Sequence, residues 1–223
     1  MKRNGVGREG VRVDLHLHSR ASGMASNWWV KGLGADAEAR ESYTSPERGY
    51  RMAKGAGMDF VTLTEHKTIE GAKSVTRHPD FFVGEEVSAR FPEDGNHADV
   101  LVYGLDERVH CEVQTRRDDI YELVAYLREE EIVHVLAYPV YAMPGPLGRD
   151  QMEKRLVLFG LWEFINGSRP GKQNWLAREL AETVGPIELR QMALRHGLGT
   201  PEHRSISGTA GSDDHGGIYG GAT

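Results

Sequence analysis

Short apolar runs alternate with amphipathic stretches along almost the whole chain. A short apolar run between turn signals is typical of a buried β-strand, whereas apolar residues three and four apart are typical of a helix. Strands that alternate with helices predict parallel β/α units, arranged in an open sheet or a closed barrel. The predicted strands are residues 11–17, 59–64, 81–88, 98–104, 132–139 and 161–166, with 208–215 closing the pattern, and the predicted helices are 44–57, 112–130, 149–159, 173–185 and 186–197.

The chain of 223 residues is long enough for one sizeable core. We expect a flexible N-terminus over residues 1–10 and a single domain over 11–223. The long irregular segment 19–43, which carries Trp28 and Trp29, is either a lid over a site or a loop packed by its tryptophans. Only eight residues follow His215, so the last helix of the alternation is missing and the sequence is expected to be a C-terminally truncated piece of a longer chain.

Composition narrows the class of protein. The net charge is −6 and the pI about 5.9, so a basic face for stable nucleic-acid binding is not expected. Cys111 is the only cysteine, which excludes an internal disulfide and a thiolate metal cage. Because the sequence shows neither a signal-peptide pattern nor an apolar run of 18 residues, we expect a cytoplasmic protein without membrane insertion.

Histidines and carboxylates collect where the predicted strands end. In parallel β/α folds the carboxyl ends of the strands form the functional face, so these side chains are expected to converge. A single histidine is most often structural, but the spacing i, i+2 repeats in two pairs, and such a pair points to one side of a strand. Imidazole and carboxylate without thiolate favour Zn, Mn or Fe. The residues are His16, His18, Glu65, His66, Glu85, Glu86, Asp213, Asp214 and His215.

Five motifs occur in a fixed order: "DLHLHS" (14–19), "DFVTLTEH" (59–66), "GEEVS" (84–88), "HVLAYP" (134–139) and "GSDDH" (211–215). In this order the chain resembles the polymerase and histidinol phosphatase (PHP) domain family. The resemblance covers residues 11–215 and implies a distorted (β/α)7 barrel that holds divalent metal ions and hydrolyses phosphoesters. The segments "FPEDG" and "VLVYG" also resemble PHP domains that precede a group 1 glycosyltransferase, which implies a fused or associated glycosyltransferase domain.

The resemblance implies three metal positions, of which one is complete. His16, His18, Glu86 and Asp213 match the first. The second shares Glu86 but has Asp99 and Tyr138 where the family has histidines. The third keeps His66 and His215 but has Gly23 where an acid is expected. We therefore expect one well-formed site and one or two weakened sites, and the longer Glu65 in "TEH" is expected to orient His66 differently.

The resemblance also implies the roles of individual residues. Metal-activated water would attack a phosphomonoester or a nucleotide-type phosphoester of a small phosphorylated substrate. Asp213 takes part in generating the nucleophile, while His66 or His215 places another ion or protonates the leaving oxygen. The cations just beyond strand ends are candidates for holding the phosphate, because a guanidinium grips two oxygens at once. They are Arg20, Lys67 and Arg169.

Two rival interpretations stay open. Amidohydrolases also begin with an HxH pair in a β/α barrel, but they take further histidines from the middle strands and a lone Asp from the last. Here the middle strands lack those histidines, while a strand-three Glu and a terminal DxH are present. A catalytically weakened PHP domain with a regulatory or structural role fits the altered ligand positions. His97, two residues before Asp99, is expected to replace a lost ligand in part, and His134 is expected at the entry end of its strand.

Overall fold

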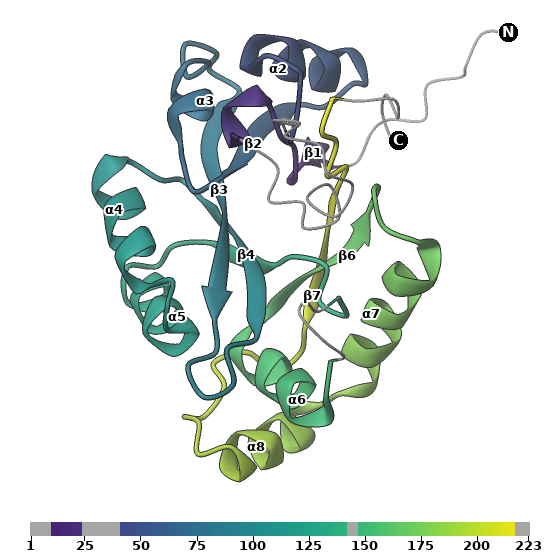
Figure 1. The fold of residues 1–223 in the computed structure, drawn as a ribbon. Helices are drawn as coiled ribbons and strands as arrows, with labels where there is room; N and C mark the ends of the chain where they lie inside the picture. Colours follow the sequence, from purple (N-terminus) through teal and green to yellow (C-terminus); the bar gives the residue numbers. More distant parts are fainter. Residues whose placement is uncertain (1–9, 24–40, 142–146, 217–223) are drawn as a thin grey trace, which may run out of the picture.

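The computed structural model describes residues 10–23, 41–141 and 147–216, and these form a seven-stranded sheet rolled into a nearly closed barrel with helices around it (Figure 1). The strands follow chain order around the sheet. The first and last strands meet where Leu17 bridges Asp214 in parallel and Asp213 N donates to His16 O at 2.7 Å. The predicted fold class, a distorted (β/α)7 barrel, is confirmed.

The strands are β1 Val13–Asp14, β2 Phe60–His66, β3 Phe81–Arg90, β4 His97–Tyr103, β5 His134–Leu136, β6 Leu161–Asn166 and β7 Ser207–Gly211. The helices are the 3₁₀ turn η1 Arg20–Ser22, α2 Pro46–Gly55, α3 Glu70–Lys73, α4 Glu107–Arg116, α5 Ile120–Glu129, α6 Arg149–Leu158, α7 Gly171–Thr183 and α8 Pro186–Arg195. Most of the segment for which we predicted a lid or packed loop, residues 24–40 with both tryptophans, lies outside the described residues. The same holds for residues 1–9 of the predicted flexible N-terminus and for the chain end 217–223, where we predicted a missing helix.

One strand overturns the expectation of a parallel sheet. β4 runs antiparallel to both β3 and β5. The physical reason is the connection from β3 to β4, residues 91–96, which is too short for the crossover that parallel strands need. Because β4 is reversed, its first residues, and not its last, lie at the carboxyl ends of its neighbours.

The predicted helix 112–130 is wrong as a single element. The structure has α4 and α5 instead, separated at residues 117–119. Asp106 caps α4 by accepting from Val109 N at 2.8 Å, and Asp119 caps α5 by accepting from Tyr121 N at 2.8 Å. An aspartate that satisfies the first free N–H groups starts a new helix wherever the chain turns.

The alternation of β3 decides which of two neighbouring glutamates faces the barrel. Glu85 points outward to α4, where His110 Nδ1 and Gln114 Nε2 lie 2.7 and 2.6 Å from its carboxylate. Glu86 points inward, opposite Leu101 of β4. Below it an apolar layer closes the barrel, formed by Leu101, Tyr103, Val135 and Ala137.

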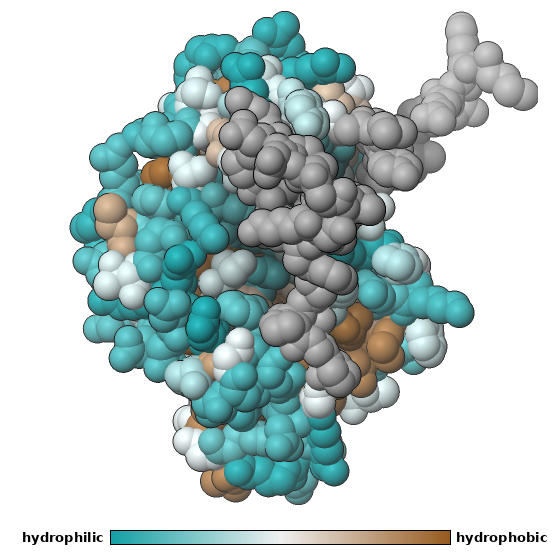
Figure 2. All heavy atoms as spheres, viewed as in Figure 1, coloured by the Kyte–Doolittle hydropathy of each residue, from teal (hydrophilic) through white to brown (hydrophobic). Residues whose placement is uncertain are grey.

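The outer surface is mainly hydrophilic on the face that Figure 2 shows, with a small hydrophobic patch beside α7. Among the helices that the structure describes, not one has the length and apolar character that crossing a membrane requires.

Candidate metal centre

The His16–His18 pair and the Asp213–His215 pair lie side by side, because β1 and β7 are neighbours where the barrel closes. His18 N donates to Asp214 O at 3.1 Å, next to the His16–Asp213 bond described above. This backbone ladder places the four side chains of His16, His18, Asp213 and His215 at one mouth of the barrel.

His16 and His18 form the buried heart of the site, and neither is exposed to solvent. Their Nε2 atoms are 3.0 Å apart. Each Nε2 lies 3.2 Å from Glu86 Oε2 and 3.5 Å from Asp213 Oδ1. Two triangles of ligand atoms therefore share the His16–His18 edge. Ligands of a tetrahedral ion with bonds of 2.0–2.2 Å lie about 3.4 Å apart, so each triangle has the spacing that such an ion needs.

Hydrogen bonds on the outer ring nitrogens orient both histidines. His16 Nδ1 donates to Glu163 Oε1 at 2.9 Å. His18 Nδ1 is 3.1 Å from Ser22 Oγ, which itself donates to Glu65 Oε2, so the serine can only accept from His18. A neutral imidazole has one donor nitrogen and one acceptor nitrogen, and both Nε2 atoms therefore turn lone pairs inward. Two lone pairs 3.0 Å apart require a proton or a cation between them.

The charged side chains of the pocket shift the pKa values of His16 and Glu86. Burial would lower the pKa of His16, but the charges of Glu163, Asp213 and Glu86 outweigh it and raise that pKa well above its usual value. Burial opposes ionisation of Glu86 as well, yet His66 and His16 lower its pKa well below the usual range. Glu86 is thus ionised near neutral pH, as a metal ligand must be.

Glu163 and Asn166 of β6 were not predicted from the sequence. Asn166 Nδ2 donates to Glu163 Oε2 at 3.0 Å and to Asp213 Oδ2 at 3.2 Å, and thereby fixes both carboxylates. The signal that could have found them is polar residues inside the apolar run "LWEFIN". Glu65, expected to orient His66, acts instead on His18 through Ser22.

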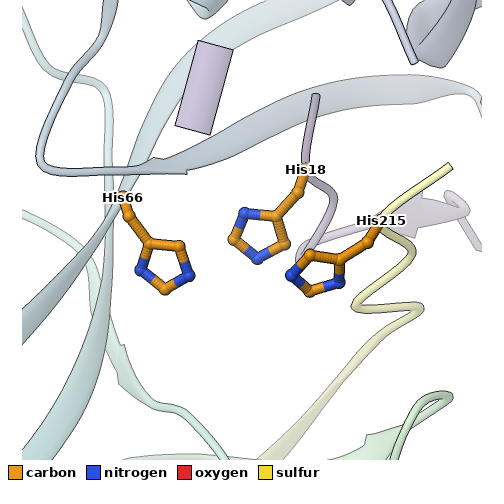
Figure 3. A group of neighbouring side chains, drawn as sticks. All are labelled: His18, His66 and His215. Atoms are coloured by element: carbon orange, nitrogen blue, oxygen red, sulfur yellow. The ribbon is translucent and has the colours of Figure 1, made fainter. Parts of the chain in front are cut away.

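Three histidines, His66, His18 and His215, stand in a row (Figure 3). The ring centroids of His18 and His66 are 4.8 Å apart, and those of His18 and His215 are 4.4 Å apart. Beside them lies Glu41, a residue that the sequence analysis missed. Burial would raise the pKa of Glu41, but hydrogen bonds from His215 and His66 lower it to about 2.

Tyr138 stands where the resemblance implies a histidine, and it is not a phenolate. Burial, followed by the charges of Asp99 and Glu86, raises the pKa of Tyr138 well above 10. The neutral hydroxyl donates to Glu86 Oε1. Arg169 lies against this ring, with Cζ 4.4 Å from the ring centroid and Nε 3.9 Å from Asp213 Oδ2. The second oxygen of Glu86 is therefore occupied by a hydrogen bond.

A cavity of about 490 Å³ opens next to His66. Asp99 and Lys67 line it, and Asp99 accepts a hydrogen bond from Ser88 Oγ. Arg20 is exposed on η1. Neither Asp99 nor His97 joins the metal-competent groups that the described residues form, which are His16, His18 and Asp213, and His18, His66 and His215.

Comparisons with known proteins agree with the barrel. No protein-family model matches the chain. An uncharacterised protein of Methanocaldococcus jannaschii is 31% identical over 61 residues, which are 27% of this chain and 32% of that protein, so the match spans about a third of the relative. The solved structure of an amidohydrolase from Chromobacterium violaceum, with bound sulfate and no metal, is similar with a TM-score of 0.56 at 15% identity, over 92% of this chain and 88% of the other. A proposed metal-dependent phosphoesterase from Bifidobacterium adolescentis is similar with a TM-score of 0.50 at 12% identity, over 94% of both chains. The chain has the fold of these two solved structures, with a buried histidine–carboxylate cluster at the mouth of the barrel.

Proposed function

We propose that this protein is a metal-dependent hydrolase of phosphoesters. The observation that carries the proposal is the pair of inward lone pairs on His16 and His18, held 3.0 Å apart beside two ionised carboxylates. The donor set of two imidazoles with Glu86 and Asp213 suits Zn, Mn or Fe. An ion held there would polarise a phosphate oxygen and lower the pKa of a coordinated water.

The chain's own residues supply the other parts of such a reaction. His66 and His215 face the open side, so they can place another ion or hold a proton for the leaving oxygen. Lys67 lines the adjoining cavity and can pair with a substrate phosphate, and Arg169 contributes a second cation beside Asp213. Glu163 and Asn166 keep His16 and Asp213 in place.

The test is hydrolysis of p-nitrophenyl phosphate and of bis(p-nitrophenyl) phosphate by metal-stripped protein with Mn or Zn added back. We expect metal-dependent turnover that is lost in Asp213→Asn. His78→Asn is the matched control, because His78 stacks on Tyr50 away from the site at a centroid distance of 3.8 Å. No turnover with any added metal would contradict the proposal.

A second candidate is amidohydrolase activity, favoured by the structural likeness to the Chromobacterium protein. Both reactions use activated water, and they differ in the bond that is broken. A panel of N-acyl amides run beside the phosphoesters separates them: turnover of amides alone would replace the proposed function by this one.

A further inference from the structure

Glu41 places a carboxylate beside the two outer histidines of the site. Its Oε1 is 3.1 Å from His66 Nε2 and 3.8 Å from His215 Nε2. We propose that Glu41, His66 and His215 form a second divalent-cation site next to the His16–His18 cluster, with Glu41 in place of the acid that is absent at Gly23. This inference rests on the proposed function, because it concerns the same metal centre.

The backbone brings Glu41 to the place of the missing acid. Glu41 N donates to Gly23 O at 3.2 Å, so the two ends of the long intervening segment meet beside η1. Thr44 O accepts from Arg20 N at 2.7 Å, and the Ser42 side chain is fully buried. The stretch that carries Glu41 is thus anchored to the turn that follows β1.

The protonation of His215 shows why a cation belongs at this point. His215 Nδ1 is 2.9 Å from the backbone carbonyl of Asp213, which can only accept, so the proton of the neutral ring lies on Nδ1. His215 Nε2, which faces the carboxylate of Glu41, is therefore the ring nitrogen that takes up either a second proton or a cation. Two acceptors that face each other repel unless a proton or a metal ion lies between them.

The three groups are also accessible enough to take up an ion. The side chains of Glu41, His66 and His215 are 21, 22 and 33% exposed, whereas those of His16 and His18 are buried completely. Glu41 and His66 both line the 490 Å³ cavity. On the inner side Glu86 Oε2 lies 3.2 Å from His66 Nε2, so one carboxylate oxygen reaches both sites. Two imidazoles and a carboxylate that leave a position open match the ligand sets of catalytic Zn sites.

Cobalt(II) titration of the metal-free full chain tests this, with the visible spectrum and the bound metal per chain as readouts. We expect the wild type to bind two ions. Glu41→Gln, which keeps the size of the side chain and removes its charge, should weaken the second ion at least tenfold, since even changes behind a ligand cost about that much. Its first ion should bind as in the wild type, which also reports that the variant folds. Glu41→His, which supplies another ligand atom, should retain the second ion.

Glu47→Gln is the matched control, because Glu47 also pairs with a histidine, His78, at 3.2 Å but lies on the outer surface by α2. It should bind both ions normally. Equal affinity of the wild type and Glu41→Gln for the second ion would overturn the inference. A wild type that binds one ion, unchanged in Glu41→Gln, would overturn it and leave the proposed function standing. A wild type that binds none would refute both.

Discussion

Replacing Tyr138 with phenylalanine removes one hydroxyl and leaves the ring in place. That hydroxyl donates to Glu86 Oε1, on a carboxylate that is fully buried. A hydrogen bond to a buried charge contributes about 1.5–3 kcal/mol. The phenylalanine keeps the contact with Arg169, so a loss of about 2 kcal/mol in the free energy of unfolding is expected, or a fall in Tm of about 4–8 °C for a chain of this size.

Metal affinity should change in the opposite direction. Without the hydroxyl, Glu86 Oε1 accepts no hydrogen bond from residue 138, so the negative charge of the carboxylate is less compensated. A bound cation compensates this charge instead. Urea unfolding in a chelator measures the first effect, and Zn titration measures the second, where we expect several-fold tighter binding. Tyr141→Phe is the control, since its ring centroid also lies 4.5 Å from Arg169 Cζ. Unchanged stability in the chelator, or weaker Zn binding by Tyr138→Phe, would refute the reasoning.

Three further predictions concern ligands, pH and metal removal. Asp213→Ala should lose the tightest ion while His97→Ala keeps it, as metal analysis after dialysis would show; equal losses would mean that the ligands are misassigned. Hydrogen bonds from Arg195 lower the pKa of buried Glu153 to about 2, against an ordinary 4.5, so its stabilisation is complete above pH 4.5 and is lost as pH falls toward 2. Glu153→Gln should therefore be less stable than the wild type by about 1–2 kcal/mol at pH 7, because exposed arginines are screened, and urea unfolding at pH 7 and 3 should show this gap closing; a constant gap would contradict it. Chelation should leave the chain folded by circular dichroism, because a proton on His16 compensates the buried carboxylates, and unfolding on chelation would point to a structural ion.

The strands and the inner cluster of His16, His18, Glu86 and Asp213 could be predicted because their signals are local. An apolar run with His-x-His at its end predicts a strand, and it also predicts that both histidines lie on the same side of that strand. The direction of β4 was also available in principle from the short connection 91–96. The break between α4 and α5 was harder, because the apolar spacing of Ile120, Leu123 and Leu127 continues the helical pattern that Asp119 interrupts.

Glu41 could not be predicted, because its place depends on where a long segment returns and not on its neighbours in sequence. Gly23 stands where the third metal position is expected to have an acid. From the sequence, an acid at position 23 is therefore the change that would complete the site. Gly23 has a φ of +85°, which an aspartate adopts only under strain. A carboxylate delivered from elsewhere in the chain supplies the charge without that strain.

The distribution of burial across the site favours catalysis over a structural ion. A structural metal site is closed by four protein ligands, whereas a catalytic one keeps a position open. Here the exposure rises from none at His16 and His18 to 22 and 33% at His66 and His215, next to a cavity lined by Lys67. Structural stability does not require a graded opening of this kind, because the buried charges are already compensated by protons and by Arg169. The proposed phosphate substrate would require it, since it would have to reach the metal-binding residues from solvent and meet a cation on the way.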